Sequence, residues 1–363
     1  MMGKIKFGIV GCGVISDTHA KAISELKDDL ELVAVCDVIE ERAKKLAEKY
    51  NVKYYLDYNE MLKDDEIDAI SVCTPSGMHA DMAELAAEHG KHVIVEKPMD
   101  ITLEQADKIV RAQEENDVVI EVIFQHRFND STITIKKLID EGKFGKIQLA
   151  TSYTKWYRSQ EYYDSGDWRG TWALDGGGAL MNQSIHYIDL MQYLVGPVDE
   201  IFAFCKTGAH ERIEVEDSAV ASVKFKNGAI GEIIGTTSAY PGIETKLEIF
   251  GQNASVIVLN NQIEKLYFKD SNIDNEIGNK TQSNAALGDA AIKPEGHLRE
   301  YIDFVNAVKN KTSPLVTPRE GRNALEIILA IYYSAVTNKP IKLPLASSVE
   351  IIEELKKLKG KGF

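Results

Sequence analysis

A lysine and a histidine stand out in this sequence because each lies where a side chain can take part in proton transfer. Lys97 follows an apolar run at residues 92–95 and the acidic Glu96, and His186 lies in an expected helix at residues 179–194. Oxidation of a secondary alcohol needs a group that accepts the hydroxyl proton, and an imidazole titrates in a suitable range. A nearby ammonium stabilises the negative charge that develops on the oxygen. We interpret His186 as the proton acceptor and Lys97 as the polarising cation, and the reverse assignment stays open.

Two polar residues flank His186 at helical spacing. Asn182 precedes it by four residues and Asp189 follows it by three, so in an α-helix all three share one face. Three glycines at 176–178 precede this helix and let the backbone approach another surface closely. Asp189 is then placed to orient the imidazole. We favour a site without a metal, and two alternatives stay open: a metal held by His186 and Asp189, and a hydrogen-bonded core histidine.

A glycine-rich turn points to a dinucleotide. The sequence GCGVIS follows the first apolar run at residues 5–10, and Gly11 and Gly13 permit a tight turn with close backbone approach to a pyrophosphate. Asp37 ends the second apolar run, 24 residues beyond Gly13. A carboxylate there accepts hydrogen bonds from the adenosine ribose and repels a 2′-phosphate. The pattern predicts NAD as the cofactor, and the alternative is an ordinary glycine turn before a helix.

The elements that must position these residues differ between the two parts of the chain. Apolar runs lie at 5–10, 32–36, 69–73, 92–95 and 118–124, and helical patterns lie between them at 40–49, 78–89 and 103–115. Alternation of this kind predicts a parallel, doubly wound Rossmann sheet with crossover helices, whose ligands bind at the carboxyl ends of the strands. Lys97 lies at such an end. Thr102 and Gln105 form an expected capping box.

After residue 125 the pattern becomes that of an α+β domain with a large, mostly antiparallel sheet. Asn227-Gly228 between two alternating runs predicts a hairpin. Other expected strands are at 146–155, 246–250, 255–259 and 265–269. Expected helices are at 133–141, 179–194, 295–309, 319–337 and 347–358. The polar segment 271–293 is interpreted as a loop. We therefore predict an α/β protein with an NAD-binding domain at 1–125 and a substrate-binding and oligomerisation domain at 126–363.

Bulk properties exclude several classes. The length of 363 residues favours two domains. A net charge of −14 argues against a nucleic-acid surface, and no run of eighteen apolar residues could span a bilayer. The four cysteines lack CxxC spacing, so we expect neither disulfides nor structural zinc. The N-terminal sequence reads as a strand rather than a signal peptide, and we expect a soluble, cytoplasmic protein.

Together these motifs resemble the glucose-fructose oxidoreductase, inositol dehydrogenase and rhizopine-catabolism (Gfo/Idh/MocA) family over nearly the whole chain. The motifs are GIVGCGVIS, the CTP segment at 73–75 with His79, the EKP turn at 96–98 and the glycine–histidine helix. The resemblance implies that Lys97 and His186 are the catalytic pair. It also implies that NAD is bound by Gly11, Gly13, Val14, Ile15, Asp37, Thr74, Pro75, His79, Glu96, Lys97 and Gln125.

A narrower resemblance concerns the nucleotide-sugar branch of that family. The segments KWYR at 155–158, DWRGTW at 167–172 and MNQ at 181–183 look like this branch, whose members include bacterial dehydrogenases that oxidise the 3-hydroxyl of UDP-N-acetylglucosamine or its uronate. Position 182 is often aspartate in the family, so Asn182 is better suited to position substrate, and Ser184 replaces a usual glycine. The substrate contacts implied are Arg127, Arg158, Trp168, Arg169, Asn182 and His186.

Three further expectations complete the interpretation. Forked arginine donors suit a carboxylate or phosphate, and the tryptophans suit the faces of a sugar. A free polyol or inositol dehydrogenase and a non-catalytic NAD-sensing protein remain alternative functions. Because an open antiparallel sheet commonly needs covering, we expect a homodimer or homotetramer that binds a small-molecule sugar or nucleotide sugar.

Overall fold

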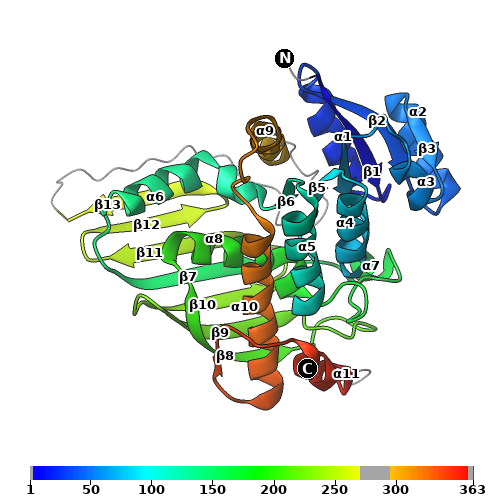
Figure 1. Ribbon diagram of the computed structural model, residues 1–363. Helices are drawn as coiled ribbons and strands as arrows, with labels where there is room; N and C mark the ends of the chain where they lie inside the picture. The colour runs from blue at the N-terminus through cyan, green and yellow to red at the C-terminus, as the bar shows by residue number, and fades with distance from the viewer. Residues whose placement is uncertain (1–2, 270–294, 359–362) are drawn as a thin grey trace. The chain divides into compact units, whose positions relative to one another are not determined.

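The computed structural model describes residues 3–269, 295–358 and 363, and its contacts divide the chain into two compact units (Figure 1). Unit 1 comprises Met1–Gln125 with Ile292–Arg322, and unit 2 comprises His126–Ala291 with Asn323–Phe363. The sequence-based boundary at 125 places residues 295–322 in the second domain, whereas the contacts of these residues are with the first unit. The expected loop at 271–293 lies outside the described residues.

Unit 1 is built on a parallel six-stranded sheet in the order β3-β2-β1-β4-β5-β6, which confirms the predicted Rossmann fold. The strands are β1 (Ile5–Val10), β2 (Leu30–Cys36), β3 (Lys53–Tyr55), β4 (Ala69–Val72), β5 (His92–Val95) and β6 (Ile120–Val122). The strand order reverses direction between β1 and β4. In such sheets a dinucleotide lies across the carboxyl ends of the strands at this switch point.

The helices of unit 1 alternate with these strands, and two helices from later in the chain join them. They are α1 (Ser16–Glu25), α2 (Glu40–Tyr50), α3 (Tyr58–Leu62), α4 (His79–Glu88), α5 (Leu103–Asn116), α9 (Glu295–Asn310) and the start of α10 (Pro318–Thr337). Thr102 accepts a hydrogen bond from the Gln105 N–H at 3.2 Å, as the capping box predicts. In α9, Tyr301 and Phe304 pack 5.4 and 5.6 Å from the ring of Phe7, which explains why this distant helix belongs to unit 1.

Unit 2 carries an eight-stranded sheet in the order β13-β12-β11-β7-β10-β9-β8-β14. Its strands are β7 (Ile147–Lys155), β8 (Val198–Lys206), β9 (Ser218–Phe225), β10 (Ile230–Thr236), β11 (Glu244–Gly251), β12 (Ala254–Leu259), β13 (Gln262–Phe268) and β14 (Ile341–Lys342). Neighbouring strands are antiparallel except β10 and β7, so the mostly antiparallel sheet is confirmed. The Asn227-Gly228 hairpin joins β9 to β10, with Gly228 at φ +87°.

One face of this sheet is covered by helices, as Figure 1 shows for α8 and α10. The helices of unit 2 are α6 (Asp130–Asp140), α7 (Gln160–Asp164), the π-helix η3 (Ala179–Ser184), α8 (Ile185–Val195), most of α10 and α11 (Val349–Lys356). A Cβ on Gly235 of β10 would lie 2.4 Å from Ser184 Oγ, so a glycine is needed where η3 crosses the sheet. On the other face, Phe204 and Val220 are 65% and 48% exposed.

The helix expected at 179–194 has two parts. Residues 179–184 form a π-helix, and the α-helix begins only at Ile185. Asn182 belongs to the π-helix, so the α-helical spacing that placed it on the face of His186 does not apply. The hydrophobic pattern does not separate these two conformations, which differ by one residue in hydrogen-bond spacing. π-Helical segments occur frequently at functional sites.

A buried ion pair fixes α8. Arg127, in the 3₁₀ helix η2 (Gln125–Phe128), donates from Nε and Nη2 to the two carboxylate oxygens of Asp189 at 2.8 and 2.5 Å. Both side chains are 1% exposed, and the guanidinium carbon lies 4.4 Å from the ring centroid of Tyr193. Removing one partner of such a pair typically costs about 3–5 kcal/mol, because the other charge stays buried. Arg127 therefore stabilises the fold, and its predicted contact with substrate stays a prediction.

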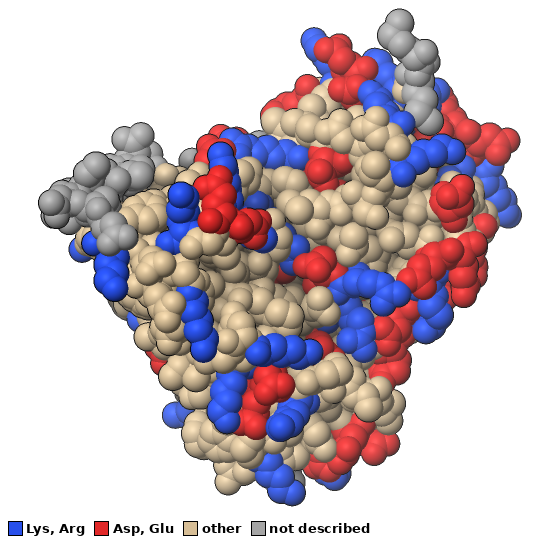
Figure 2. Space-filling view, turned by 60° about the vertical axis from the view of Figure 1, so that its left-hand side comes forward, with Lys and Arg blue, Asp and Glu red and all other residues tan. Residues whose placement is uncertain are grey.

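Two properties of the structure bear on the classes of protein that the sequence argues against, namely membrane-spanning and nucleic-acid-binding proteins. Within the described residues, no helix is long and apolar enough to cross a membrane. On the face that Figure 2 shows, Lys and Arg side chains are interspersed with Asp and Glu, and uncharged surface lies between them. This face therefore carries no continuous basic tract of the kind that binds a phosphate backbone.

Candidate functional site

The turn after β1 contains two glycines with different surroundings: Gly11 is packed against other backbone, and Gly13 faces open space. Gly11 has φ +88°, and a Cβ there would lie 2.6 Å from the backbone of Cys73. A Cβ on Gly13 would meet nothing within 4 Å, and the neighbouring Val14 is 83% exposed. Ile15 is the N-cap of α1. The turn is therefore packed against the end of β4, while its Gly13 side is open to a ligand.

Asp37, at the end of β2, stabilises this turn from its other side. Its carboxylate accepts the N–H of Cys12 and the N–H of Ile39, both at 2.8 Å. A carboxylate offers about four acceptor positions, so positions remain for ribose hydroxyls. The next residue, Val38, is 87% exposed and was not singled out from the sequence. Val14 and Val38 thus present apolar surface beside the turn that a planar ring could cover.

His79 connects the loops that follow β4 and β5. Its Nε2 lies 2.9 Å from the carbonyl oxygen of Thr74, and its Nδ1 lies 2.7 Å from that of Pro98. The ring is buried, so it supports these two loops from within. The Thr74 hydroxyl is buried without a hydrogen-bond partner among the described residues, and Pro75 begins the short helix Ser76–Met78. The free Thr74 hydroxyl is a candidate ligand contact.

Glu96 is held by two histidines that the sequence analysis did not identify. Its Oε1 lies 3.1 Å from His19 Nε2 and 3.4 Å from His297 Nε2, while Oε2 accepts the backbone N–H of Lys97 at 3.1 Å. His19 Nδ1 in turn contacts the Tyr301 hydroxyl at 2.9 Å. Burial alone would raise the pKa of Glu96, but the hydrogen bonds from the two imidazoles lower it well below its usual value. A fixed carboxylate therefore anchors the turn that carries Lys97.

The same three side chains have the donor types of a metal site. The ligand atoms of His19, Glu96 and His297 all lie within 4.8 Å of one another. Two histidines and one carboxylate would suit zinc. The nitrogen–oxygen distances are also those of hydrogen bonds, and this interpretation accounts for the second contact of His19 with Tyr301. Sequence spacing could not suggest the cluster, since its members lie on α1, after β5 and on α9.

In unit 2, His186 lies in the first turn of α8 and is buried. Its ring stacks on that of His126, with centroids 4.8 Å apart and an interplanar angle of 29°. The edge of Tyr187 meets the His126 ring at 5.7 Å. His126 is not identifiable from the sequence, because stacking between positions 60 residues apart leaves no local pattern. His126 therefore fixes the orientation of the candidate proton acceptor.

The glycine triplet before η3 is held by a buried glutamate. Glu216 accepts the N–H groups of Gly178 and Leu180 at 2.9 and 2.8 Å. A Cβ on Gly178 would lie 1.8 Å from the Glu216 carbonyl oxygen, which confirms the close backbone approach expected of these glycines. Burial raises the pKa of Glu216 to about 7. This second buried carboxylate fixes the start of the segment that leads to His186.

The other polar side chains of η3 point to the preceding loop. Asn182 donates from Nδ2 to Asp175 at 2.9 Å, and Asp175 also accepts the N–H of Gly170 at 2.8 Å. Gln183 donates from Nε2 to the Tyr162 hydroxyl at 3.1 Å. Asn182 is therefore oriented by an acidic neighbour, and Gln183 connects η3 to the aromatic residues of α7.

Two arginines and three aromatic rings form what we call the arginine–aromatic cluster (Trp156, Arg158, Tyr162, Trp168 and Arg169). The Arg158 guanidinium lies 4.9 Å from the Trp156 ring centroid and 5.3 Å from that of Tyr162. The Arg169 guanidinium lies 4.5 Å from both Tyr162 and Trp168. The structure thus brings together three residues that the sequence analysis assigned to substrate. Trp172 instead packs 5.4 Å from Tyr332.

The hydrogen bonds of the cluster arginines go to neutral acceptors. Arg158 donates to the carbonyl oxygen of Tyr157 at 3.0 Å, and Arg169 donates to the hydroxyls of Tyr162 and Ser165 at 3.0 and 3.2 Å. Within the described part of the chain neither arginine forms an ion pair, and the buried Arg158 Nε has no acceptor. Arg158, only 9% exposed, is a cation held largely away from water without a counter-ion, and such an arrangement is costly; Arg169 is half-buried. The cluster is therefore suited to an anion.

Gln125 completes the residues expected to contact the cofactor. It belongs to unit 1, and its Oε1 is buried without a hydrogen-bond partner among the described residues. The candidate cofactor residues, Lys97 included, thus belong to unit 1, and Arg127, the arginine–aromatic cluster, Asn182 and His186 belong to unit 2. That Lys97 and His186 act on one substrate stays a prediction.

This sheet and glycine turn define an NAD-binding oxidoreductase, and comparison with known proteins supports that class. Residues 5–124 match an oxidoreductase family with an NAD-binding Rossmann fold, and residues 132–257 match the GFO/IDH/MocA C-terminal domain. The chain belongs to the GFO/IDH/MocA oxidoreductase family. It is an NAD-dependent dehydrogenase of a family that includes enzymes for sugars and polyols.

Three similar proteins illustrate the ligands and substrates named for members of this family. The WlbA dehydrogenase from Bordetella pertussis, crystallised with NADH and UDP-GlcNAcA, is 36% identical with a TM-score of 0.85, over 94% of this chain and 99% of that one. The WlbA dehydrogenase from Chromobacterium violaceum, in complex with the same two molecules, is 32% identical with a TM-score of 0.84, over 95% and 97%. Myo-inositol 2-dehydrogenase from Thermotoga maritima is 26% identical over 93% of this chain and 98% of its own.

The two turn glycines give a matched pair of variants. Gly11→Ala places a Cβ against the Cys73 backbone at a left-handed φ, and we expect it to lower stability by more than about 1 kcal/mol. Gly13→Ala meets open space, so it should unfold like the wild type yet bind NADH about tenfold more weakly, a loss of roughly 1.4 kcal/mol. Thermal unfolding and NADH fluorescence titration measure both effects, with Gly3→Ala as control. Wild-type NADH affinity in Gly13→Ala would contradict this placement of the cofactor.

Proposed function

We propose that this dehydrogenase oxidises a secondary hydroxyl, the 3-hydroxyl, of a UDP-N-acetylhexosamine or its uronate. The observation that carries the proposal is the pair of arginines, Arg158 and Arg169, that have no carboxylate partner among the described residues. A nucleotide sugar brings a diphosphate, and the uronate adds a carboxylate, both of which suit forked guanidinium donors. A neutral polyol has no charge to compensate either arginine.

The relatives add support of a second kind. Two proteins that are 36% and 32% identical to this chain were crystallised with both NADH and UDP-GlcNAcA. Trp168, stacked on Arg169, offers an aromatic ring beside the cationic cluster. Such a ring packs well against the apolar face of a sugar. We therefore place the charged part of the substrate at the two arginines and a sugar ring near Trp168.

The proposed chemistry divides between two side chains. His186 accepts the proton of the reacting hydroxyl, and the Lys97 ammonium stabilises the negative charge that develops on its oxygen; the opposite assignment is the alternative. NAD, when bound, supplies the hydride acceptor. His126 orients the His186 ring by stacking, and Glu96 fixes the turn of Lys97 through its backbone. Asn182, held by Asp175, positions the substrate.

The cofactor contacts are assigned to unit 1. The open space at Gly13 receives the pyrophosphate at the start of α1, where backbone N–H groups favour an anion. Asp37 accepts the ribose hydroxyls, and the exposed Val14 packs on the adenosine part. The buried, unpartnered Thr74 hydroxyl and Gln125 carbonyl offer polar groups further along the same edge.

A free polyol or inositol dehydrogenase is the second candidate. The specific observation in its favour is the myo-inositol 2-dehydrogenase relative, which matches 93% of this chain. The residues proposed for proton transfer would serve either substrate, because both reactions remove hydride from a carbon that bears a hydroxyl. The arginine–aromatic cluster is the feature that distinguishes the two, since inositol carries no anionic group.

The catalytic pair can be tested by separating turnover from cofactor binding. Lys97→Ala and His186→Ala should each lower kcat by at least about 100-fold, the usual range for losing general acid–base assistance, with NADH affinity within about twofold of wild type. NADH absorbance and fluorescence measure the two properties, and Lys108→Ala on the surface of α5 is the control. Wild-type rates in either variant would reject the assignment. Wild-type protein that binds NAD but turns over no sugar would favour the sensing function.

The substrate class can be tested with the cluster arginines. Replacing Arg158 or Arg169 by Met should lower kcat/KM for UDP-N-acetylglucosamine or its uronate by about 10- to 100-fold, as expected for hydrogen bonds to a charged group. The exposed Arg111→Met is the matched control. A greater loss on the uronate than on the uncharged sugar would assign that arginine to the carboxylate, and equal losses would assign it to the diphosphate. Faster wild-type turnover of myo-inositol than of either nucleotide sugar would overturn the proposal.

We further propose that a second copy of the chain covers the open face of the unit 2 sheet. Phe204 of β8 pairs with Val220 of β9, and both are exposed on that face. Ile230 of β10, 56% exposed, and Leu149 of β7, 38% exposed, form another cross-strand pair. Such a patch of exposed apolar side chains is typical of an interaction surface. The expected homodimer or homotetramer would bury it.

The assembly is open to a direct measurement. Phe204→Lys should shift the molar mass, measured by light scattering, toward that of the 40.4 kDa monomer, because a buried ammonium is unfavourable in an apolar interface. Val349→Lys changes an apolar residue that is 55% exposed on α11, and it should leave the mass unchanged. A monomeric wild-type protein would contradict the proposed interface.

A further inference from the structure

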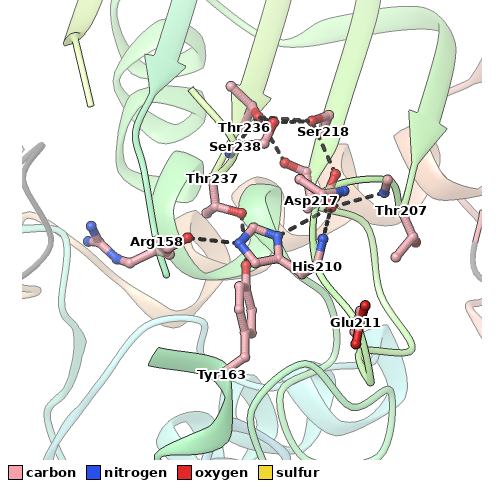
Figure 3. A network of polar contacts seen from close by, with 12 residues as sticks. Arg158, Tyr163, Thr207, His210, Glu211, Asp217, Ser218, Thr236, Thr237 and Ser238 are labelled. Carbon is pink, nitrogen blue, oxygen red and sulfur yellow. Dashed lines mark hydrogen bonds and ion pairs between the residues drawn. The ribbon is translucent and has the colours of Figure 1, made fainter. Parts of the chain in front are cut away.

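His210 connects the arginine–aromatic cluster to a buried carboxylate. It lies in the loop between β8 and β9, and its side chain is 4% exposed. Figure 3 shows the ring between two acceptors: Nε2 is 2.8 Å from the carbonyl oxygen of Arg158, and Nδ1 is 3.3 Å from Asp217 Oδ2. A neutral imidazole has one N–H and one lone pair, so it can donate to only one of them. Two acceptors therefore favour a ring that carries both protons.

Asp217 has the partners of a permanent carboxylate. Its Oδ2 also accepts the backbone N–H groups of Gly208, Ala209 and His210 at 3.0, 2.6 and 3.1 Å. Burial alone would raise the pKa of Asp217, but the hydrogen bonds from His210 and these N–H groups lower it to about 2. Burial would lower the pKa of His210, yet the hydrogen bonds to Asp217 and to the Arg158 carbonyl raise it. Both directions agree with the geometry of a charged pair.

The remaining surroundings of His210 leave Asp217 as its charged partner. Tyr163 of α7 packs on the ring with centroids 4.7 Å apart, and its hydroxyl contacts Thr237 Oγ1 at 2.8 Å. Burial raises the pKa of Tyr163, so it stays neutral. Glu211 follows along the chain and is exposed. Arg158 faces His210 with its carbonyl oxygen, and in Figure 3 its guanidinium points away from the ring.

The backbone of Arg158 is thereby held at both its N–H and its carbonyl oxygen. Its N–H donates to the Thr237 carbonyl oxygen at 2.8 Å, and its own carbonyl oxygen accepts from His210. The first bond connects it to the end of β10, and the second connects it to the loop that Asp217 fixes. Loss of the His210 bond would free one end of the backbone that carries the Arg158 guanidinium.

We propose that doubly protonated His210 is a positioning residue that orients Arg158 toward the anionic group of the substrate, which makes substrate affinity depend on pH through His210. This inference rests on the proposed function, because it takes Arg158 as a substrate contact. His210 itself touches neither substrate nor cofactor. The backbone bond from its Nε2 is what transmits its protonation state to Arg158.

The sign of the pH dependence follows from the raised pKa of His210. Substrate binds best to enzyme in which His210 is protonated, so the affinity is lost as the pH rises through the pKa of His210 in the folded protein, which lies above the ordinary value of about 6.5. Affinity for the anionic substrate should therefore be full in mildly acidic solution and fall on the alkaline side. Asp217 is protonated, and the charged pair lost, only in acid, between roughly pH 4 and 2.

The charge state can be measured without any substrate. In protein labelled with ¹⁵N-histidine, NMR at pH 6 should show two ring N–H groups for His210, assigned by their absence in His210→Gln. A ring with a single N–H at that pH would overturn the proposal. This measurement holds whatever the enzyme oxidises, so its failure is separate from a failure of the proposed function.

Two amide variants test the positioning role. The Gln side chain places its N–H₂ near the position of Nε2 and keeps the bond to Arg158, whereas that of Asn reaches only the position of Nδ1 and keeps the bond to Asp217. We expect His210→Asn to raise KM for the UDP-N-acetylglucosamine uronate about tenfold with kcat unchanged. His210→Gln should keep a KM near that of the wild type, and this KM should no longer rise at alkaline pH.

Controls separate this role from general destabilisation. The exposed His89→Gln should leave KM and its pH profile unchanged. The two His210 variants should show similar melting temperatures if both keep the fold. Three results would each overturn the positioning role. They are an equal increase of KM in the Asn and Gln variants, a decrease in kcat alone, and a KM that neither variant changes.

Discussion

Buried carboxylates that are satisfied by fixed N–H donors are the constraint on which this structure depends. Glu96 is held by two imidazoles, Asp189 by a guanidinium, and Glu216 and Asp217 by backbone N–H groups. A buried carboxyl group, above all a charged one, is tolerated only with such partners. Each of the four acids fixes a segment that carries a candidate functional side chain, so the same bonds that stabilise the fold also position the site.

The arginine–aromatic cluster shows the opposite arrangement. Its cations are held by ring faces and neutral oxygens, whereas the buried Asp189 of the same unit is paired with the Arg127 guanidinium. Under the proposed function this difference favours an anionic substrate, which would supply the counter-ion that no side chain of the described chain gives the two arginines. Family membership supplies the chemistry of hydride removal, and in the proposed function the cluster selects the hydroxyl-bearing molecule that is bound.

The sequence predicted those features of the fold that local residue patterns determine. The parallel sheet, the Asn227-Gly228 hairpin and the Thr102 cap follow from periodicity and turn chemistry, and the structure has all three. The short β3, α3 and β14 span too few residues to show a period, and β8 was missed although it is long. His19, His126, His210, Glu216 and His297 were also missed, because their partners are distant in sequence or lie on the backbone. The π-helix was mistaken for α-helix, since both bury the same apolar residues.

The return of α9 to unit 1 has a consequence for biosynthesis. Tyr301 and Phe304 complete a core around Phe7, so the apolar surface of β1 is covered only after α9, far downstream in the sequence, has been synthesised. Until then the nascent Rossmann sheet exposes hydrophobic surface that chaperones recognise. For the same reason, a fragment that ends at residue 125 lacks part of its own interior.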